Sequence, residues 1–163
     1  MARKIPNIVK EIKNNPPAPI NFAYQKNVSY SQMSIFRGCP HRWKLQYKDK
    51  IKRFTSSIHT VFGTAMHESI QYYLDYAFEN SFAAANRDID LKEDFQGRYI
   101  SEYQAQYKKN NDSHFSDALE MREFFEDGIA ILEWFKKKRS RYFSKKGTYL
   151  VGCEVPIVIA PNK

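Results

Sequence analysis

The sequence contains few cysteines, few glycines and no long apolar run, and each shortage excludes a class of protein. Two cysteines, Cys39 and Cys153, are too few for a disulfide framework, or for a zinc or iron–sulfur site made of cysteines within this chain. Six glycines among 163 residues, with 42% hydrophobic residues, favour helices over a turn-rich all-β fold. No stretch approaches the roughly 20 apolar residues of a membrane span, and the N-terminus lacks the apolar core of a secretory signal. We therefore expect a cytosolic protein that makes no membrane contact.

The net charge of +8 is unevenly distributed. The segment from Asp75 to Asp127 holds 13 acidic and 6 basic residues, whereas seven basic residues and one acid lie between Arg37 and Arg53. Seven more basic residues, and no acid, lie between Lys136 and Lys146. Such clusters attract phosphate backbones, although each could also be a solvated helix face. The candidate nucleic-acid-binding residues are Arg37, His41, Arg42, Lys44, Lys48, Lys136, Lys137 and Arg139.

Proline and hydrophobic spacing predict the organisation of the chain. Four of the seven prolines fall in the first 19 residues, so we expect a flexible arm over residues 1–28 and one domain over 29–163. Apolar residues at spacings of three and four predict helices over 31–47, 65–78, 92–109 and 113–141. Pro40 predicts a kink in the first of them or its division into two short helices. The aromatic stripes of these helices are interpreted as core.

The pattern changes from helical to alternating near the C-terminus. Apolar side chains occupy every second position from Tyr149 to Ile159, and Glu154 falls on the opposite face. This alternation predicts a strand over residues 148–159. Because a single strand leaves hydrogen-bonding groups unpaired along both edges, we expect another strand to pair with it. The expected fold class is therefore mainly α with the first strand of an α/β sheet.

Four motifs, taken in order, resemble the opening of RecB-type nuclease domains in the PD-(D/E)XK superfamily. They are the Ser-x-Ser of Ser29–Ser31, the Cys39–Trp43 segment, the Phe62–Glu68 segment with its Gly-x-x-x-His, and Glu154 on the predicted strand. The resemblance extends over nearly the whole chain, to a group that includes AddB-like and CRISPR-associated exonucleases. It implies an incomplete PD-(D/E)XK core consisting of the helical N-terminal half of the domain.

The resemblance also implies roles for individual residues. His67 would bind a metal, Mg²⁺ or Mn²⁺, Glu154 would lie near it as a metal ligand and catalytic carboxylate, and the helix from Ser31 would lie against DNA. The family continues with a Gly-x-x-Asp strand and an (Asp/Glu)-x-Lys strand, and neither occurs in this sequence. Some relatives use the Cys-Pro cysteine in an iron–sulfur cluster with three further cysteines. Because those three are missing here, we expect no such cluster from this chain.

The residues themselves agree with an incomplete site. A hard divalent cation needs several oxygen ligands, which one histidine and one glutamate do not supply. A lone histidine is more often satisfied by solvent or backbone, but the Gly-x-x-x-His setting of His67 favours a ligand. Glu154 is either an exposed strand charge or a site residue, and we favour the site.

Three functions remain open at this stage. The first is the N-terminal half of a metal-dependent DNA nuclease that is inactive alone and completed by a second polypeptide or a downstream segment carrying the two missing motifs. The second is a non-catalytic DNA-binding or recombination accessory protein. The third is a helical subunit whose basic faces bind an acidic protein. We favour the first.

Overall fold

The structure, a computed structural model, describes residues 5–15, 29–51, 56–143, 145 and 147–153. The chain divides into a smaller unit, Ala18–Thr55, and a larger unit made of Met1–Pro17 and Ser56–Lys163. Helix α1 (Asn7–Asn14) belongs to the larger unit and lies within the segment predicted as an arm. None of the helices in the described ranges has the length and apolar character needed to cross a membrane.

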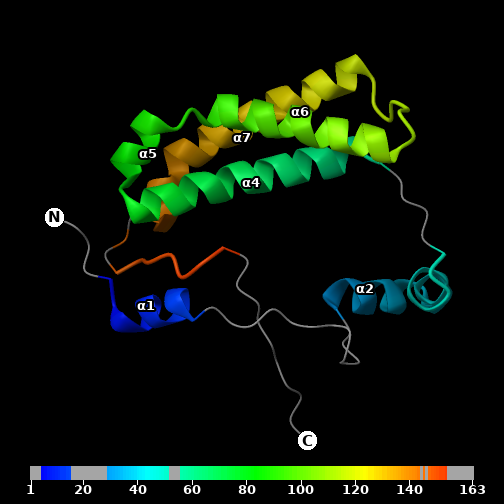
Figure 1. Ribbon diagram of the computed structural model, residues 1–163, viewed down its shortest axis with the longest axis horizontal. Coiled ribbons are helices and arrows are strands. Elements are labelled where there is room, and N and C mark those ends of the chain that lie inside the picture. The colour runs from blue at the N-terminus through cyan, green and yellow to red at the C-terminus, as the bar shows by residue number, and fades with distance from the viewer. Residues whose placement is uncertain (1–4, 16–28, 52–55, 144, 146, 154–163) are drawn as a thin grey trace, which may run out of the picture. The chain divides into compact units, whose positions relative to one another are not determined.

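Three long helices form the body of the larger unit: α4 (Ile58–Glu79), α6 (Leu91–Lys109) and α7 (Ala118–Phe143). Short α5 (Phe82–Asp88) connects α4 to α6. Each long helix packs against the other two, and α6 runs antiparallel to both α4 and α7 (Figure 1). Buried side chains recur at spacings of three and four along α4 and α6, so each helix turns one face to a shared core.

The N-termini of α4 and α6 are capped in different ways. The Asp90 carboxylate accepts hydrogen bonds from the backbone N–H groups of Lys92 (2.9 Å) and Glu93 (3.2 Å), which starts α6. The start of α4 depends instead on buried Gln106 of α6. Its side-chain Oε1 accepts from the Ser57 backbone N–H at 3.4 Å, and its carbonyl accepts from the Ser56 hydroxyl at 3.2 Å. The first turn of α4 is therefore held by tertiary contact.

The prediction of a helix over 92–109 is confirmed by α6, but the predicted helix over 65–78 begins too late. Helix α4 starts at Ile58, so Phe62, Gly63 and Thr64 are already helical. The apolar positions on either side, Val61 and Ala65, are fully buried. Packing of these neighbours outweighs the cost of about 1 kcal/mol that glycine brings to a helix interior.

Aromatic side chains fill the core, as their interpretation as core residues predicted. Phe95 of α6 is fully buried and lies 5.6 Å from Tyr99, 5.8 Å from Phe125 and 6.1 Å from Phe62, measured between ring centroids. Gly128 allows α7 to approach this ring, because a Cβ there would stand 2.5 Å from Phe95 Cζ. The absence of a side chain at Gly128 thus sets how closely α6 and α7 pack.

The smaller unit contains α2 (Tyr30–Gly38), α3 (Pro40–Trp43) and a π-helical turn, η1 (Lys44–Lys48). The Ser29 hydroxyl caps α2 by accepting from the Gln32 backbone N–H at 3.2 Å. Pro40 opens α3 at its first position, so the predicted helix over 31–47 is divided into two, as the proline indicated. None of the residues in these three elements is buried.

The predicted strand over 148–159 is wrong in the part that the structure describes. Residues 148–153 form neither helix nor strand, and no strand occurs anywhere in the described ranges; residues 154–159 lie outside them. The expected fold class, mainly α with the first strand of a PD-(D/E)XK sheet, is therefore corrected to all-α for the described chain. Alternation identifies an apolar side, but a strand also needs a neighbouring strand for its hydrogen bonds, and the described residues supply none.

Candidate functional site

His67 lies on the outer face of α4, in a shallow surface hollow. Gly63, Thr64, His67, Glu68 and Gln71 line it, which places the whole hollow on two turns of one helix. The side chains of His67 and Gln71, one turn apart, meet with their Nε2 atoms 2.7 Å apart. If the Gln71 amide donates this bond, the Nε2 lone pair of His67 accepts it, so a metal at Nε2 would have to displace Gln71.

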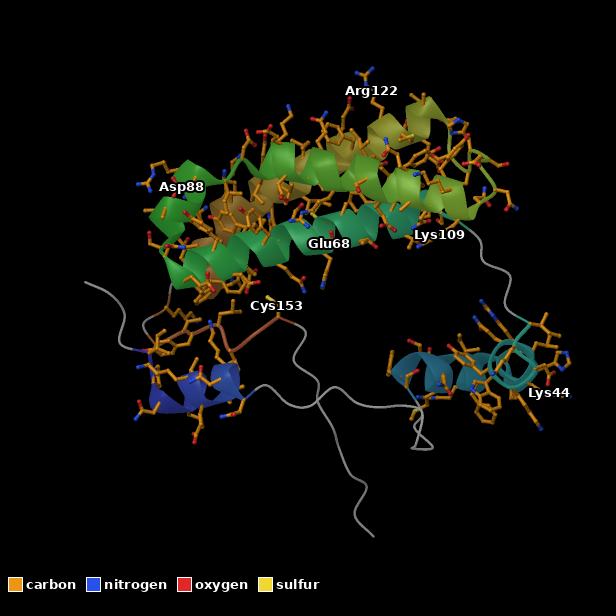
Figure 2. The ribbon with its side chains drawn as sticks, viewed as in Figure 1. Lys44, Glu68, Asp88, Lys109, Arg122 and Cys153 are labelled. Atoms are coloured by element: carbon orange, nitrogen blue, oxygen red, sulfur yellow. The ribbon has the colours of Figure 1, made fainter. Side chains whose placement is uncertain are left out.

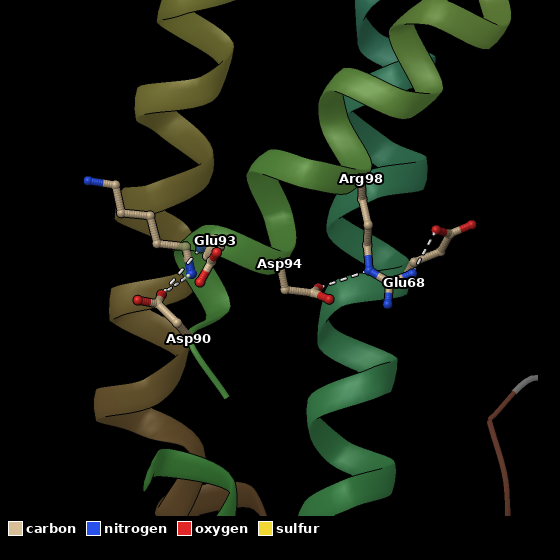
Figure 3. A network of polar contacts seen from close by, with 6 residues as sticks. Glu68, Asp90, Glu93, Asp94 and Arg98 are labelled. Carbon is tan, nitrogen blue, oxygen red and sulfur yellow. Dashed lines mark hydrogen bonds and ion pairs between the residues drawn. The ribbon is translucent and has the colours of Figure 1, made fainter. Parts of the chain in front are cut away.

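Glu68, next to His67, joins a network that connects α4 to α6 (Figure 3). Its carboxylate accepts a hydrogen bond from Arg98 at 3.0 Å, and Arg98 also donates to Asp94 at 2.9 Å. The guanidinium lies 5.7 Å from the ring centre of Tyr72. The hydrogen bond to Asp94, helped by that to Glu68, raises the pKa of Arg98 above its ordinary value. The network therefore orients Glu68 toward α6 at the level of His67.

The coil that follows α7 reaches α4 near the same face. Figure 2 shows Cys153 beside α4, where its thiol is 3.5 Å from a carboxylate oxygen of Asp75. His67, Gln71 and Asp75 are spaced by four residues and share one side of the helix, with His67 and Asp75 separated by about 12 Å of helical rise. Glu154 follows Cys153 in the sequence and lies outside the described residues.

The basic residues predicted near the N-terminus all belong to the smaller unit and are all exposed. They lie on α2, α3 and η1, with Lys44 labelled in Figure 2, and comprise Arg37, His41, Arg42, Lys44 and Lys48. Trp43 lies among them, 5.6 Å from Phe36 and 6.3 Å from Tyr47 between ring centroids. Asp49 is the only acid between residues 29 and 51, so this unit has a strongly positive surface.

The basic residues predicted on α7 fall on different sides of that helix. Lys137 is exposed, whereas Lys136 and Arg139 are half-buried. Arg139 lies 6.0 Å from the ring centre of Phe82 and donates a hydrogen bond to the Lys136 carbonyl. Two cations that the sequence analysis did not select, Lys138 and Arg141, are exposed. The positions of buried Leu132 and Phe135 around the helix would have separated the half-buried cations from the exposed ones.

Comparison with protein families decides the affiliation of the chain. The sequence model described as PD-(D/E)XK nuclease superfamily matches residues 27–152. This chain belongs to that superfamily. The match runs from within the smaller unit to the coil after α7 and so includes the His67 hollow. No significant match was found among curated proteins or among solved structures.

Nucleases of this superfamily generally use Mg²⁺ or Mn²⁺, and the described residues of this member do not by themselves form such a site. Within the described ranges, no three side chains of histidine, cysteine, aspartate or glutamate gather closely enough to hold an ion. His67 offers one nitrogen, and Glu68 is engaged with Arg98. Octahedral Mg²⁺ requires more oxygen ligands than this set provides.

Proposed function

We propose that this superfamily member is the DNA-binding helical part of a Mg²⁺- or Mn²⁺-dependent nuclease similar to the RecB-type exonucleases. The observation that carries the proposal is the presentation of His67 in an exposed hollow of α4, within the region that matches the superfamily model. In this proposal His67 and Glu154 are metal ligands and Glu154 is also catalytic. A second polypeptide or a further segment bearing Gly-x-x-Asp and (Asp/Glu)-x-Lys supplies the other groups.

The assignment of Glu154 rests on the sequence resemblance. Its neighbour Cys153 bonds to Asp75 of α4, about 12 Å along the helix from His67, and Glu154 itself lies outside the described residues. Glutamate oxygen atoms are hard ligands of the kind Mg²⁺ prefers. The charge distribution supports the DNA part of the proposal, because five predicted basic residues of the smaller unit are exposed together.

A complementation assay tests the nuclease proposal. The whole chain is incubated with DNA and Mn²⁺, alone and with a polypeptide carrying the two missing motifs. We expect no cleavage by the chain alone, cleavage on mixing, and loss of that cleavage with His67→Ala or Glu154→Gln. Gln104→Ala, which changes an exposed side chain on α6, serves as the control and should cleave normally. Robust cleavage by the chain alone would contradict the incomplete site, and failure of the pair to cleave would favour an accessory DNA-binding protein.

DNA binding is tested separately, in EDTA so that no metal-dependent chemistry intervenes. Replacing Arg37, Arg42, Lys44 and Lys48 with glutamine removes four positive charges. The plot of log affinity against log salt concentration should therefore become shallower, its slope decreasing in magnitude by about 3 to 4. The matched control replaces four exposed cations of the acidic segment, Lys92, Lys108, Lys109 and Arg122. Equal effects of the two sets, or binding that ignores salt, would favour an acidic protein as the partner.

A further inference from the structure

The C-terminal half of α7 carries exposed aromatic rings among its positive charges. Trp134 is 54% exposed and Tyr142 is 55% exposed, and neither belongs to the hydrophobic core. We name the exposed residues Ile131, Trp134, Lys138, Arg141 and Tyr142 the α7 stripe. Their spacings of three and four place them on one side of the helix. The buried residues Gly128, Leu132 and Phe135 lie about 90° around the helix from the centre of the stripe, so the stripe is an exposed flank beside the buried face.

Helix electrostatics accounts for only part of this surface. Lysine and arginine near a helix C-terminus interact favourably with the helix dipole, which is sufficient reason for positive charge at this end of α7. It gives no reason for an exposed indole and an exposed phenol on the same side. Tryptophan is enriched at binding interfaces relative to other surfaces, and this one begins a segment, residues 134 to 147, that contains no acid. An anionic occupant that offers flat apolar surface would match both the cations and the rings.

Single-stranded nucleic acid meets both requirements. Its bases are open on their faces and stack on aromatic side chains, while basic side chains contact the phosphates between them. Trp134 and Tyr142 are separated by about 12 Å along the helix, with Lys138 and Arg141 between them. That separation exceeds one stacking step of about 3.4 Å, so the two rings take bases that are not stacked on each other. A duplex hides its base faces and would use only the cations.

We propose that the α7 stripe binds single-stranded nucleic acid by stacking bases on Trp134 and Tyr142. This inference rests on the proposed function and specifies its substrate as a separated strand. It also assigns the contact with nucleic acid to Lys138, Arg141 and the two rings, none of which is among the predicted nucleic-acid-binding residues. The surface belongs wholly to the larger unit and is distinct from the basic residues of the smaller unit.

Tryptophan fluorescence and anisotropy test the proposal on the full chain. The chain contains two tryptophans, so Trp43→Phe leaves Trp134 as the only reporter. The probe is a labelled oligothymidylate of about 20 nucleotides in EDTA, with a duplex of equal length for comparison. We expect quenching of Trp134 by the single strand. We also expect Trp134→Ala to weaken single-strand binding at least about tenfold with little change for the duplex, and Trp134→Phe to restore most of the affinity.

Controls separate this inference from the function on which it rests. Leu119→Ala changes a residue of the same helix that is 66% exposed and lies outside the stripe, and it should bind as the unchanged chain does. Single-strand affinity unaffected by Trp134→Ala, or equal losses for single strand and duplex, would overturn the stripe while leaving binding through the smaller unit intact. Co-sedimentation with phosphatidylserine-containing vesicles that requires Trp134, with unchanged oligonucleotide binding, would overturn it in favour of a membrane. If no variant binds any nucleic acid, both proposals fail.

Discussion

The helices of the larger and smaller units have similar apolar spacing in sequence but opposite environments in the structure. Phe95, Tyr99 and Tyr103 of α6 are at most 7% exposed, whereas Met33 and Phe36 of α2 are about half exposed, at 51% and 50%. The difference lies in what surrounds the helix. Helix α6 has α4 and α7 along its sides, whereas the described part of the smaller unit, residues 29–51, has two short helical segments besides α2. Apolar periodicity therefore predicts a helix and its face, but not whether that face is covered.

The largest expected effect comes from removing a ring from each unit. Phe95→Ala deletes a fully buried ring that contacts three other aromatics, so it should lower the free energy of unfolding by about 3–5 kcal/mol. Phe36→Ala removes a half-exposed ring of the smaller unit. We expect it to lower the free energy of unfolding of the larger unit by less than about 1 kcal/mol. Urea denaturation followed by circular dichroism at the helical band measures both. Comparable losses would show that the smaller unit also stabilises the helical bundle.

A pair of glycines gives a smaller and sharper test of the packing in the larger unit. In Gly128→Ala the added methyl meets the Phe95 ring and stands 3.2 Å from Phe62 Cε2, so overpacking should outweigh the helix-propensity gain and cost about 1–2 kcal/mol. Gly97→Ala on α6 meets nothing within 4 Å and should stabilise by about 0.5–1 kcal/mol. Thermal unfolding of the two variants should therefore shift in opposite directions. A stabilising Gly128→Ala would mean that α7 can move away from α6 without loss.

The sequence predicted that the long helices exist because apolar positions recur along one face of each. The helix predicted over 113–141 nevertheless begins five residues before α7, which starts at Ala118. It misplaced the start of α4 because the residue that holds this start, Gln106, lies about fifty positions away and leaves no local mark. The strand prediction failed for a similar reason. Residues 148–153 alternate, but alternation does not supply a pairing partner, which no local pattern contains.

The candidate site was predictable to a similar extent. The Gly-x-x-x-His motif marked His67, and the structure adds Gln71 and the Glu68–Arg98–Asp94 network around it, which joins residues 30 apart. Composition identified the basic cluster on α7 without separating exposed Lys138 from half-buried Arg139. That separation depends on the phase of the helix against its core. The roles of His67, Glu154 and the basic residues stay predictions that the proposed assays address.

The smallest expected effect concerns the buried phenols of the larger unit and the way in which stability changes at high pH. Burial raises the pKa of Tyr99 to about 12, and its hydroxyl donates to the Met121 carbonyl at 3.1 Å. A phenol whose pKa is higher in the folded than in the unfolded chain favours the folded state. This contribution is fully present below the unfolded pKa, near 10, and is lost as the pH rises toward 12. Tyr99→Phe should therefore lose about 1 kcal/mol at neutral pH through the missing hydrogen bond, and its stability should fall less steeply between pH 10 and 12. Urea midpoints at pH 8, 10 and 11 measure both effects.

Part of the alkaline slope should remain, because burial also raises the pKa values of Tyr73 and Tyr103. Tyr30→Phe, in the smaller unit and 86% exposed, is the matched control and should leave the slope unchanged. An alkaline slope that Tyr99→Phe does not alter would show that this phenol ionises without opening the core, and that the bundle is looser around α6 than its burial indicates.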